Sequence, residues 1–375
     1  MTYEEILSVV NETSVSQDLQ AIAHKVIQNE RITQQECLTL FTEAELGFVG
    51  ILADFVRFRT NENIVFFNKN LHIEPTNICI HNCTFCSYSK KKGDPLCWEM
   101  SIDEMLEVIS KIPENSITEV HIVGGVHPDR GINFYCDLLK AIKQIRPSIQ
   151  IKAFTAVEID FMAKKSGFFI SEILQKLQEA GLQTMPGGGA EIFDETLRAK
   201  ICPSKTSSER WLKIHETAHK IGIPTNATML YGHIEQFEHR VDHLTRLRDL
   251  QDKTNGFQAF IPLKYKKENN YLGIEHELPW SEDLRNFAIS RVYLDNFKNI
   301  KAYWPMLGKE LSQMTLEFGV NDFDGTINDS TKIYSMAGAD EANPNLTEEQ
   351  MITLISKVGR TATERDSLYN IITTH

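Results

Sequence analysis

The segment 78–89, with the sequence ICIHNCTFCSYS, places three of the chain's seven cysteines within eight residues. Cys79, Cys83 and Cys86 form a CxxxCxxC pattern directly after an apolar stretch that predicts a strand over 71–77. Three thiolates at this spacing can bind three corners of a cubane iron–sulfur cluster and leave one iron open for a ligand. A structural zinc site needs four closed ligands, and no second CxxC accompanies this motif. A zinc knuckle is therefore the weaker alternative.

From Leu71 onward, short β-rich stretches alternate with amphipathic helical stretches. The predicted strands cover 71–77, 119–125, 149–159, 182–187, 224–230, 256–263, 299–306 and 318–324. Eight strand–helix units in succession predict an α/β fold, a closed (β/α)8 barrel of the TIM type. An open doubly wound sheet is the alternative, but no GxGxxG follows the first strand.

The sequence divides into three parts around this barrel. We expect an N-terminal helical extension over 1–66, the barrel over 67–330 and a C-terminal helical closing segment over 331–375. The predicted helix N-termini carry capping-box spacing, at Thr33 with Glu36, Ser101 with Glu104, Thr206 with Glu209 and Thr347 with Gln350.

Composition restricts the class of protein. Hydrophobic residues make up 42% and charged residues 24% of the chain, which is enough for a full core. The net charge of −12 argues against nucleic-acid and anionic-membrane partners. No apolar run approaches the roughly 20 residues of a membrane span, and the N-terminus lacks the basic region of a signal peptide. We therefore expect a cytoplasmic protein without a disulfide framework.

Active sites of such barrels lie at the C-terminal ends of the strands. This rule selects the candidates Gly124, Gly125, His127, Glu158, Glu191, His233, Glu235, Gln258, Lys264, Asp322 and Asp324. Glu191 follows three glycines, 187–189, which let the backbone pass close to a ligand. Its carboxylate can accept hydrogen bonds from two ribose hydroxyls, or it can compensate a helix N-terminus.

The cysteine motif, with Phe85 before the third cysteine, resembles the radical S-adenosylmethionine (SAM) superfamily. The resemblance implies a [4Fe-4S] cluster held by the three cysteines and a SAM molecule whose cleavage gives a 5′-deoxyadenosyl radical. It also implies that Gly124 and Gly125 hold the methionine ammonium group and that the backbone of Tyr88 contacts the adenine. Many members have a glutamate where this chain has Val126. Glu158 and Glu191 are further candidates for cofactor binding.

A narrower resemblance rests on four segments. KAFTAVEI (152–159), MPGGGAEIF (185–193), TNATMLYGHIE (225–235) and GFQAFIP (256–262) resemble the aminofutalosine synthases of the futalosine route to menaquinone. The related cyclic dehypoxanthinylfutalosine synthases are the alternative. They differ in having two prolines in place of Ala156 and Val157, and a threonine in place of Asn226.

This resemblance implies that the adenosyl radical adds to the double bond of 3-[(1-carboxyvinyl)oxy]benzoate. The aryl ring then migrates, CO2 is lost, and SAM is consumed in forming 6-amino-6-deoxyfutalosine. The partners would be this aryl enolpyruvyl ether and an electron donor such as flavodoxin or ferredoxin. His127 and His233 are the candidate catalytic residues, with Lys264 and Arg291 as candidate cations for the substrate carboxylates. A non-catalytic iron–sulfur protein is the alternative from another class, and it would need no barrel.

Overall fold

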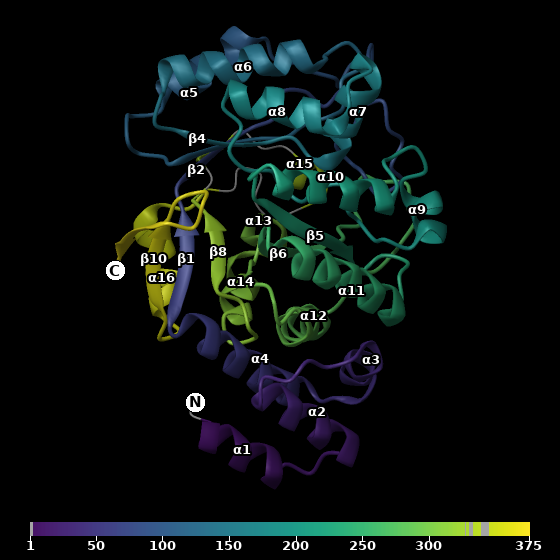
Figure 1. The fold of residues 1–375 in the computed structure, drawn as a ribbon, viewed down its shortest axis with the longest axis vertical. Coiled ribbons are helices and arrows are strands. Elements are labelled where there is room, and N and C mark those ends of the chain that lie inside the picture. Colours follow the sequence, from purple (N-terminus) through teal and green to yellow (C-terminus); the bar gives the residue numbers. More distant parts are fainter. Residues whose placement is uncertain (1–2, 327, 330–332, 339–344) are drawn as a thin grey trace.

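The computed structural model describes residues 3–326, 328–329, 333–338 and 345–375 (Figure 1). The strands are β1 (Ile64–Asn68), β2 (Asn70–Ile73), β3 (Glu119–Ile122), β4 (Gln150–Ala153), β5 (Thr225–Tyr231), β6 (Phe257–Lys264), β7 (Asn299–Ile300), β8 (Asp322–Gly325), β9 (Asn328–Asp329), β10 (Thr361–Arg365) and β11 (Ile371–Thr374). The helices are α1 (Tyr3–Glu12), α2 (Gln17–Ile27), α3 (Gln34–Glu43), α4 (Leu46–Asn61), α5 (Ile102–Lys111), α6 (Ile132–Ile145), α7 (Ala156–Ser166), α8 (Ile170–Ala180), α9 (Glu195–Ile201), α10 (Ser208–Lys220), α11 (Phe237–Thr254), α12 (Trp280–Tyr293), α13 (Trp304–Leu307), α14 (Lys309–Thr315), α15 (Ile333–Met336) and α16 (Glu348–Ser356).

Parallel strands close into a ring. β2, β3 and β4 pair in that order, and so do β5, β6 and β7. Isolated bridges at Thr184 and Met185 join β4 to β5, and a bridge between Lys301 and Asp322 joins β7 to β8. β8 pairs with β1 and β9 with β2, so the successive strands β1 and β2 together close the ring. The prediction of a (β/α)8 barrel is confirmed.

Several predicted strands are too long, and two of them run into helices. β4 ends at Ala153, and α7 begins three residues later, because the Thr155 hydroxyl accepts a hydrogen bond from the Glu158 N–H and forms a capping box that the sequence analysis did not identify. β7 ends at Ile300, and the following residues turn into α13, which carries a proline in its first turn. The segment 182–187 pairs only through isolated bridges.

The predicted capping boxes at Thr33, Ser101 and Thr347 are confirmed. In each, the hydroxyl accepts the N–H of the residue three positions on, whose side chain accepts the N–H of the cap. The prediction at Thr206 is wrong by one residue, because Ser207 is the N-cap of α10.

The N-terminal helices α1–α4 form a layer beneath the barrel, where α4 packs against α12 and α3 against α11 (Figure 1). The expected extension over 1–66 contains these four helices, but its end falls inside β1, the first half of a barrel strand. Among the described residues, none of the helices combines the length and the apolar character that crossing a membrane requires.

The sequence predicts a helical C-terminal segment, but the described part of this segment also contains two strands. After α16, β10 pairs in parallel with β1 and β11 pairs antiparallel with β10. The turn between β10 and β11 closes the N-terminal end of the barrel, where Ser367 donates to Glu119 and Tyr369 donates to Asp322 at 2.6 Å. The expected boundary at residues 330 and 331 lies outside the described residues.

Candidate active site

Two cavities lie at the C-terminal ends of the barrel strands and share a wall. The outer cavity is lined by the cysteine loop and the inner cavity by the barrel interior. Including the open solvent at their mouths, they measure about 1220 Å³ and 840 Å³. The residues that line both are Tyr88, Val123, Gly124, Thr155, Gly188 and Leu263. A ligand in one cavity can therefore contact a ligand in the other.

The cysteine loop forms one wall of the outer cavity. Cys79, Cys83 and Cys86 all line it, as the CxxxCxxC pattern predicts for ligands of one group. The ammonium of Lys91 donates to the three carbonyl oxygens of residues 79–81 at distances of 3.0 to 3.2 Å. These hydrogen bonds fix the conformation of the first part of the loop.

The three thiols suit a cluster better than a zinc ion. Among the described residues, no group that includes these cysteines brings three ligand atoms within 4.8 Å of one another. One tetrahedral zinc ion requires sulfur atoms about 3.8 Å apart, whereas a cubane spreads its ligands further. Burial raises the pKa of Cys83 to about 12, and metal binding favours the thiolate form of such a group.

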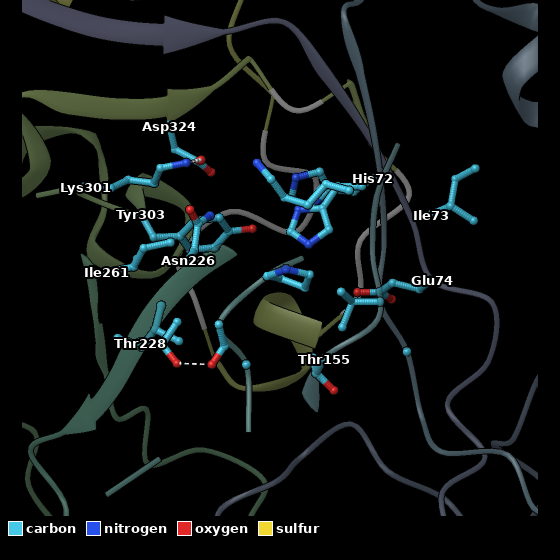
Figure 2. A pocket seen from close by; sticks show the side chains of 18 of the residues that line it. His72, Ile73, Glu74, Thr155, Asn226, Thr228, Ile261, Lys301, Tyr303 and Asp324 are labelled. Carbon is cyan, nitrogen blue, oxygen red and sulfur yellow. Dashed lines mark hydrogen bonds and ion pairs between the residues drawn. The ribbon is translucent and has the colours of Figure 1, made fainter. Parts of the chain in front are cut away.

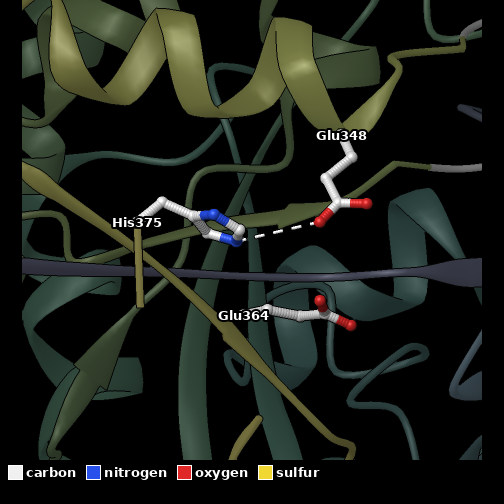
Figure 3. Close-up of side chains that lie close together, drawn as sticks. All are labelled: Glu348, Glu364 and His375. Atoms are coloured by element: carbon white, nitrogen blue, oxygen red, sulfur yellow. Dashed lines mark ion pairs between the residues drawn. The ribbon is translucent and has the colours of Figure 1, made fainter. Parts of the chain in front are cut away.

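A different group of potential metal ligands lies at the opposite end of the sequence. Glu348, Glu364 and His375 bring three ligand atoms within 4.8 Å (Figure 3). The ammonium of Lys69 lies 3.3 Å from the Glu348 carboxylate and 3.0 Å from the Glu364 carboxylate. Because this lysine already pairs with both carboxylates, we interpret the group as an ion-pair network rather than a metal centre.

The glycine pair after β3 packs directly against the start of the cysteine loop. A Cβ on Gly124 would lie 2.9 Å from the carbonyl oxygen of Thr76, and one on Gly125 would lie 2.4 Å from that of Ile78. Only glycine allows this approach. The Gly124 N–H donates to Glu158, and burial raises the pKa of that carboxyl to about 7 although hydrogen bonds act in the opposite direction.

Tyr88 lies at the junction of the two cavities. Its hydroxyl donates to the Thr76 carbonyl oxygen at 3.0 Å, and its ring contacts Trp98 edge to face at 5.2 Å. Burial, together with the nearby carboxylate of Glu74, raises the pKa of Tyr88 well above its ordinary value. The residue therefore stays a neutral, fixed part of the wall.

Glu191 lines the outer cavity in an ion pair that the sequence did not predict. Its carboxylate lies 2.6 Å from the ammonium of Lys205, which also lies 5.2 Å from the centre of the Phe85 ring. The backbone of Glu191 is left-handed, with φ of 49°. Although burial acts against it, the Cys83 thiol and the Glu191 carboxylate hold the pKa of Lys205 well above its ordinary value.

The inner cavity has a polar end and an apolar wall (Figure 2). Its polar groups are those of His72, Glu74, His121, Lys152, Thr155, Asn226, Thr228, Lys301, Tyr303 and Asp324. Among the described residues, the buried side-chain oxygen of Asn226 has no hydrogen-bond partner. Ile73, Val123, Ile261 and Leu263 form the apolar wall.

Buried ion pairs surround the polar end of the inner cavity. They are Lys152–Glu119, Lys301–Asp324 and Arg365–Asp322, each at 2.7 Å. The sequence analysis selected Asp324 as a candidate. It did not select Lys152, Lys301, His72 or His121, which also line this cavity. They lie on β2, β3, β4 and directly after β7 and line the barrel interior, an arrangement that only the register of the closed barrel reveals.

The two histidines expected to be catalytic lie elsewhere. His127 Nε2 lies 3.1 Å from Glu99, and His233 Nδ1 lies 3.3 Å from Glu235. As the described residues form them, neither the outer nor the inner cavity includes either side chain in its lining. Both histidines belong to loops that turn their rings into the protein, and the catalytic role expected for them stays a prediction.

Other candidates make structural contacts. Glu158 accepts a hydrogen bond from the Gly124 N–H and, among the described residues, lies outside the linings of both cavities, so its contact with the cofactor stays a prediction. Arg291 is buried and donates to the Gly319 carbonyl oxygen at 2.7 Å, far from solvent. Lys264 does line the outer cavity, and its ammonium lies 2.7 Å from Asp283. The remaining candidates outside both linings are Glu235, Gln258 and Asp322.

Comparison with known proteins agrees with this site. Residues 73–247 match the Radical SAM superfamily, and residues 254–374 match the CofH/MqnC C-terminal region. The chain is 43% identical to the aminodeoxyfutalosine synthase of Thermus thermophilus, over 93% of this chain and 94% of that protein. It is 37% identical to the cyclic dehypoxanthine futalosine synthase of Streptomyces coelicolor, over 96% and 90% of the two chains.

Solved structures show the same fold. Methylornithine synthase superposes with a TM-score of 0.72 at 17% identity, over 90% of this chain and 96% of that one. The FeFe-hydrogenase maturase from Carboxydothermus hydrogenoformans gives a TM-score of 0.73 at 17% identity, over 98% and 86%. At these identities the likeness concerns the fold alone.

A closed barrel with a three-cysteine loop facing a glycine-lined cavity defines a radical SAM enzyme. The chain belongs to the radical SAM superfamily and, within it, to the family that includes the aminodeoxyfutalosine synthases. Its cofactors are a [4Fe-4S] cluster and SAM, and it acts on a small molecule.

Proposed function

We propose that the chain is an aminodeoxyfutalosine synthase, which joins the 5′-deoxyadenosyl group of SAM to an aryl enolpyruvyl ether. The proposal is supported by 43% identity to a protein of that name over nearly the whole chain. The two adjoining cavities are consistent with it, because the reaction needs two bound molecules in contact.

Within this proposal, Cys79, Cys83 and Cys86 ligate the cluster. The bound cluster and SAM supply the 5′-deoxyadenosyl radical. The cysteine loop holds the cluster against the outer cavity, and the Gly124–Gly125 pair gives close access to the methionine end of SAM. Glu191 accepts hydrogen bonds from the ribose hydroxyls, and Lys205 holds its carboxylate in place.

The aryl enolpyruvyl ether occupies the inner cavity, with its double bond at the junction beside Tyr88 and Thr155. The apolar wall of Ile261 and Leu263 packs on the aryl ring and excludes water from the radical. Orientation of the double bond toward the adenosyl carbon favours addition over hydrogen abstraction. An external one-electron donor such as flavodoxin or ferredoxin reduces the cluster.

Anaerobic turnover of the reconstituted enzyme tests the proposal. The enzyme is offered SAM, dithionite and either 3-[(1-carboxyvinyl)oxy]benzoate or dehypoxanthine futalosine, and the products are identified by mass spectrometry. We expect 6-amino-6-deoxyfutalosine from the first compound and no product from the second. Cyclisation of the second compound alone would make the chain a cyclic dehypoxanthine futalosine synthase instead.

Cysteine variants test the cluster ligands separately. Replacing Cys79, Cys83 or Cys86 with Ala removes a thiolate, so we expect loss of the brown colour, of bound iron and of turnover. Cys97→Ala is the matched control, because this thiol lies nearby but lines neither cavity. Stoichiometric zinc without iron after reconstitution would contradict the assignment.

A further inference from the structure

Four nitrogen-bearing side chains meet at the polar end of the inner cavity. Lys152, Lys301, His72 and His121 all line it, and the two imidazole rings lie 4.6 Å apart. Figure 2 shows Lys301 and His72 in this lining. The lysine side chains are only 4% and 2% exposed. The steps proposed above for the reaction give none of these groups a role. Buried N–H donors around a cavity are suited to an anionic ligand.

The ion pairs leave the lysines with donors to spare. Lys152 donates to the Glu119 carboxylate and Lys301 to the Asp324 carboxylate, each at 2.7 Å. An ammonium group carries three N–H donors, so each lysine retains donors beyond its ion pair. A carboxylate in the cavity can accept from both lysines without breaking either pair.

The charges at this end of the cavity already cancel. Three buried cations, Lys152, Lys301 and Arg365, face three buried anions, Glu119, Asp322 and Asp324. Glu74, further along the same wall, is a further buried carboxyl group. An entering carboxylate would therefore add an uncompensated negative charge in a buried place, which is costly.

The histidine pair can supply the missing positive charge. Burial lowers the pKa of His72 to about 4 and that of His121 well below its ordinary value, so both rings are neutral when the cavity holds no anion. The facing carboxylates of Asp324 and Glu119 favour the protonated ring, whereas the facing ammonium groups of the two lysines oppose it. One more carboxylate shifts this balance toward protonation.

We propose that the polar end of the inner cavity binds the ring carboxylate of the aryl enolpyruvyl ether through Lys152 and Lys301, and that the His72–His121 pair takes up one proton from solvent as the anion enters. The orientation rests on the proposed function. The double bond must reach the adenosyl group in the outer cavity, so the carboxylate at the far side of the ring points to the polar end.

Isothermal titration calorimetry of the anaerobic, oxidised holoenzyme with SAM tests this proposal. Without a reductant the enzyme does not turn over, so binding alone is measured. The ligands are 3-[(1-carboxyvinyl)oxy]benzoate and its analogue with a carboxamide in place of the ring carboxylate. In buffers of different ionisation enthalpy, we expect uptake of one proton for the acid and none for the amide. Linkage of one proton weakens acid binding up to about tenfold per unit rise in pH, and the amide binds roughly 10- to 100-fold more weakly than the acid.

Variants test whether the His72–His121 pair is the source of the proton uptake. H72F/H121F keeps two rings in contact but cannot take up a proton, so we expect the proton uptake and the pH dependence to vanish. K301M/D324N removes an ion pair as a unit and should weaken binding of the acid but not of the amide. His24→Asn, on helix α2 and outside the linings of both cavities, is the control and should behave as the parent enzyme.

The outcomes separate the two proposals. Equal affinity for acid and amide without proton uptake, in an enzyme that still forms 6-amino-6-deoxyfutalosine, would overturn the carboxylate site and leave the proposed function intact. Proton uptake that persists in H72F/H121F would overturn the role of the histidine pair. Failure of both ligands to bind, with no product formed, would instead overturn the proposed function.

Discussion

Replacing Glu191 with Gln tests the proposed SAM contact most sharply. The substitution keeps the shape of the side chain but removes the charge that accepts hydrogen bonds from the ribose hydroxyls. It also removes the partner of Lys205, whose ammonium lies 2.6 Å away. Two effects are therefore expected, one on SAM affinity and one on folding stability, and they must be measured separately.

The structure sets the size of each effect. A hydrogen bond to a charged group contributes about 1.5–3 kcal/mol, which corresponds to a roughly 10- to 150-fold weaker dissociation constant for SAM. Breaking a buried ion pair by removing one partner costs about 3–5 kcal/mol. Because the side chains of Glu191 and Lys205 are 10% and 17% exposed, we expect the lower end of that range.

The assay measures the SAM dissociation constant by equilibrium dialysis and the unfolding free energy in urea. The double variant E191Q/K205M removes both partners, so it should recover much of the stability while SAM binding stays weak. Glu195→Gln is the matched control, since this carboxylate is on the following helix and outside the cavity. A SAM dissociation constant unchanged in E191Q would refute the contact and leave Glu191 as the partner of Lys205 only.

Three further predictions concern the loop and its supports. Gly125→Ala should abolish SAM binding, because its Cβ would lie 2.4 Å from a backbone oxygen, whereas Gly47→Ala has no atom within 4 Å and should leave binding unchanged. His127→Asn should keep kcat within about twofold by a turnover assay, since its buried ring lies outside the linings of both cavities; a hundredfold loss would support the catalytic role predicted from the sequence. Burial raises the pKa of Glu158 to about 7 from an ordinary 4.5, so this group should lower the free energy of unfolding as pH rises from 4.5 to 7. In urea titrations, the E158Q variant should lose that pH dependence.

The barrel could be predicted from the sequence because alternating strand and helix patterns are local. The cysteine motif and the glycine pair are local too, since each needs only its own spacing. β1 was missed because it lies directly after α4 and continues into β2, and its partner β10 is nearly 300 residues away in the chain. A pairing of that kind leaves no local pattern.

The inner cavity could not be predicted for a related reason. His72, His121 and Lys152 lie on three different strands and Lys301 follows a fourth, and only the register of the closed barrel brings them together. In contrast, His127 and His233 follow strands in the sequence and were selected for that reason, although local hydrogen bonds turn both away. A position directly after a strand is therefore weaker evidence that a residue lines the cavity than an inward-facing position within a strand.

The fate of the adenosyl group tests the central claim most directly. SAM labelled in its adenosyl carbons is turned over anaerobically with 3-[(1-carboxyvinyl)oxy]benzoate, and the label is traced by mass spectrometry. We expect the label in a benzoate-containing nucleoside, methionine in equal amount, and free 5′-deoxyadenosine only as a minor product. If 5′-deoxyadenosine matches turnover one to one and the product carries no label, the enzyme abstracts hydrogen and is not an aminodeoxyfutalosine synthase.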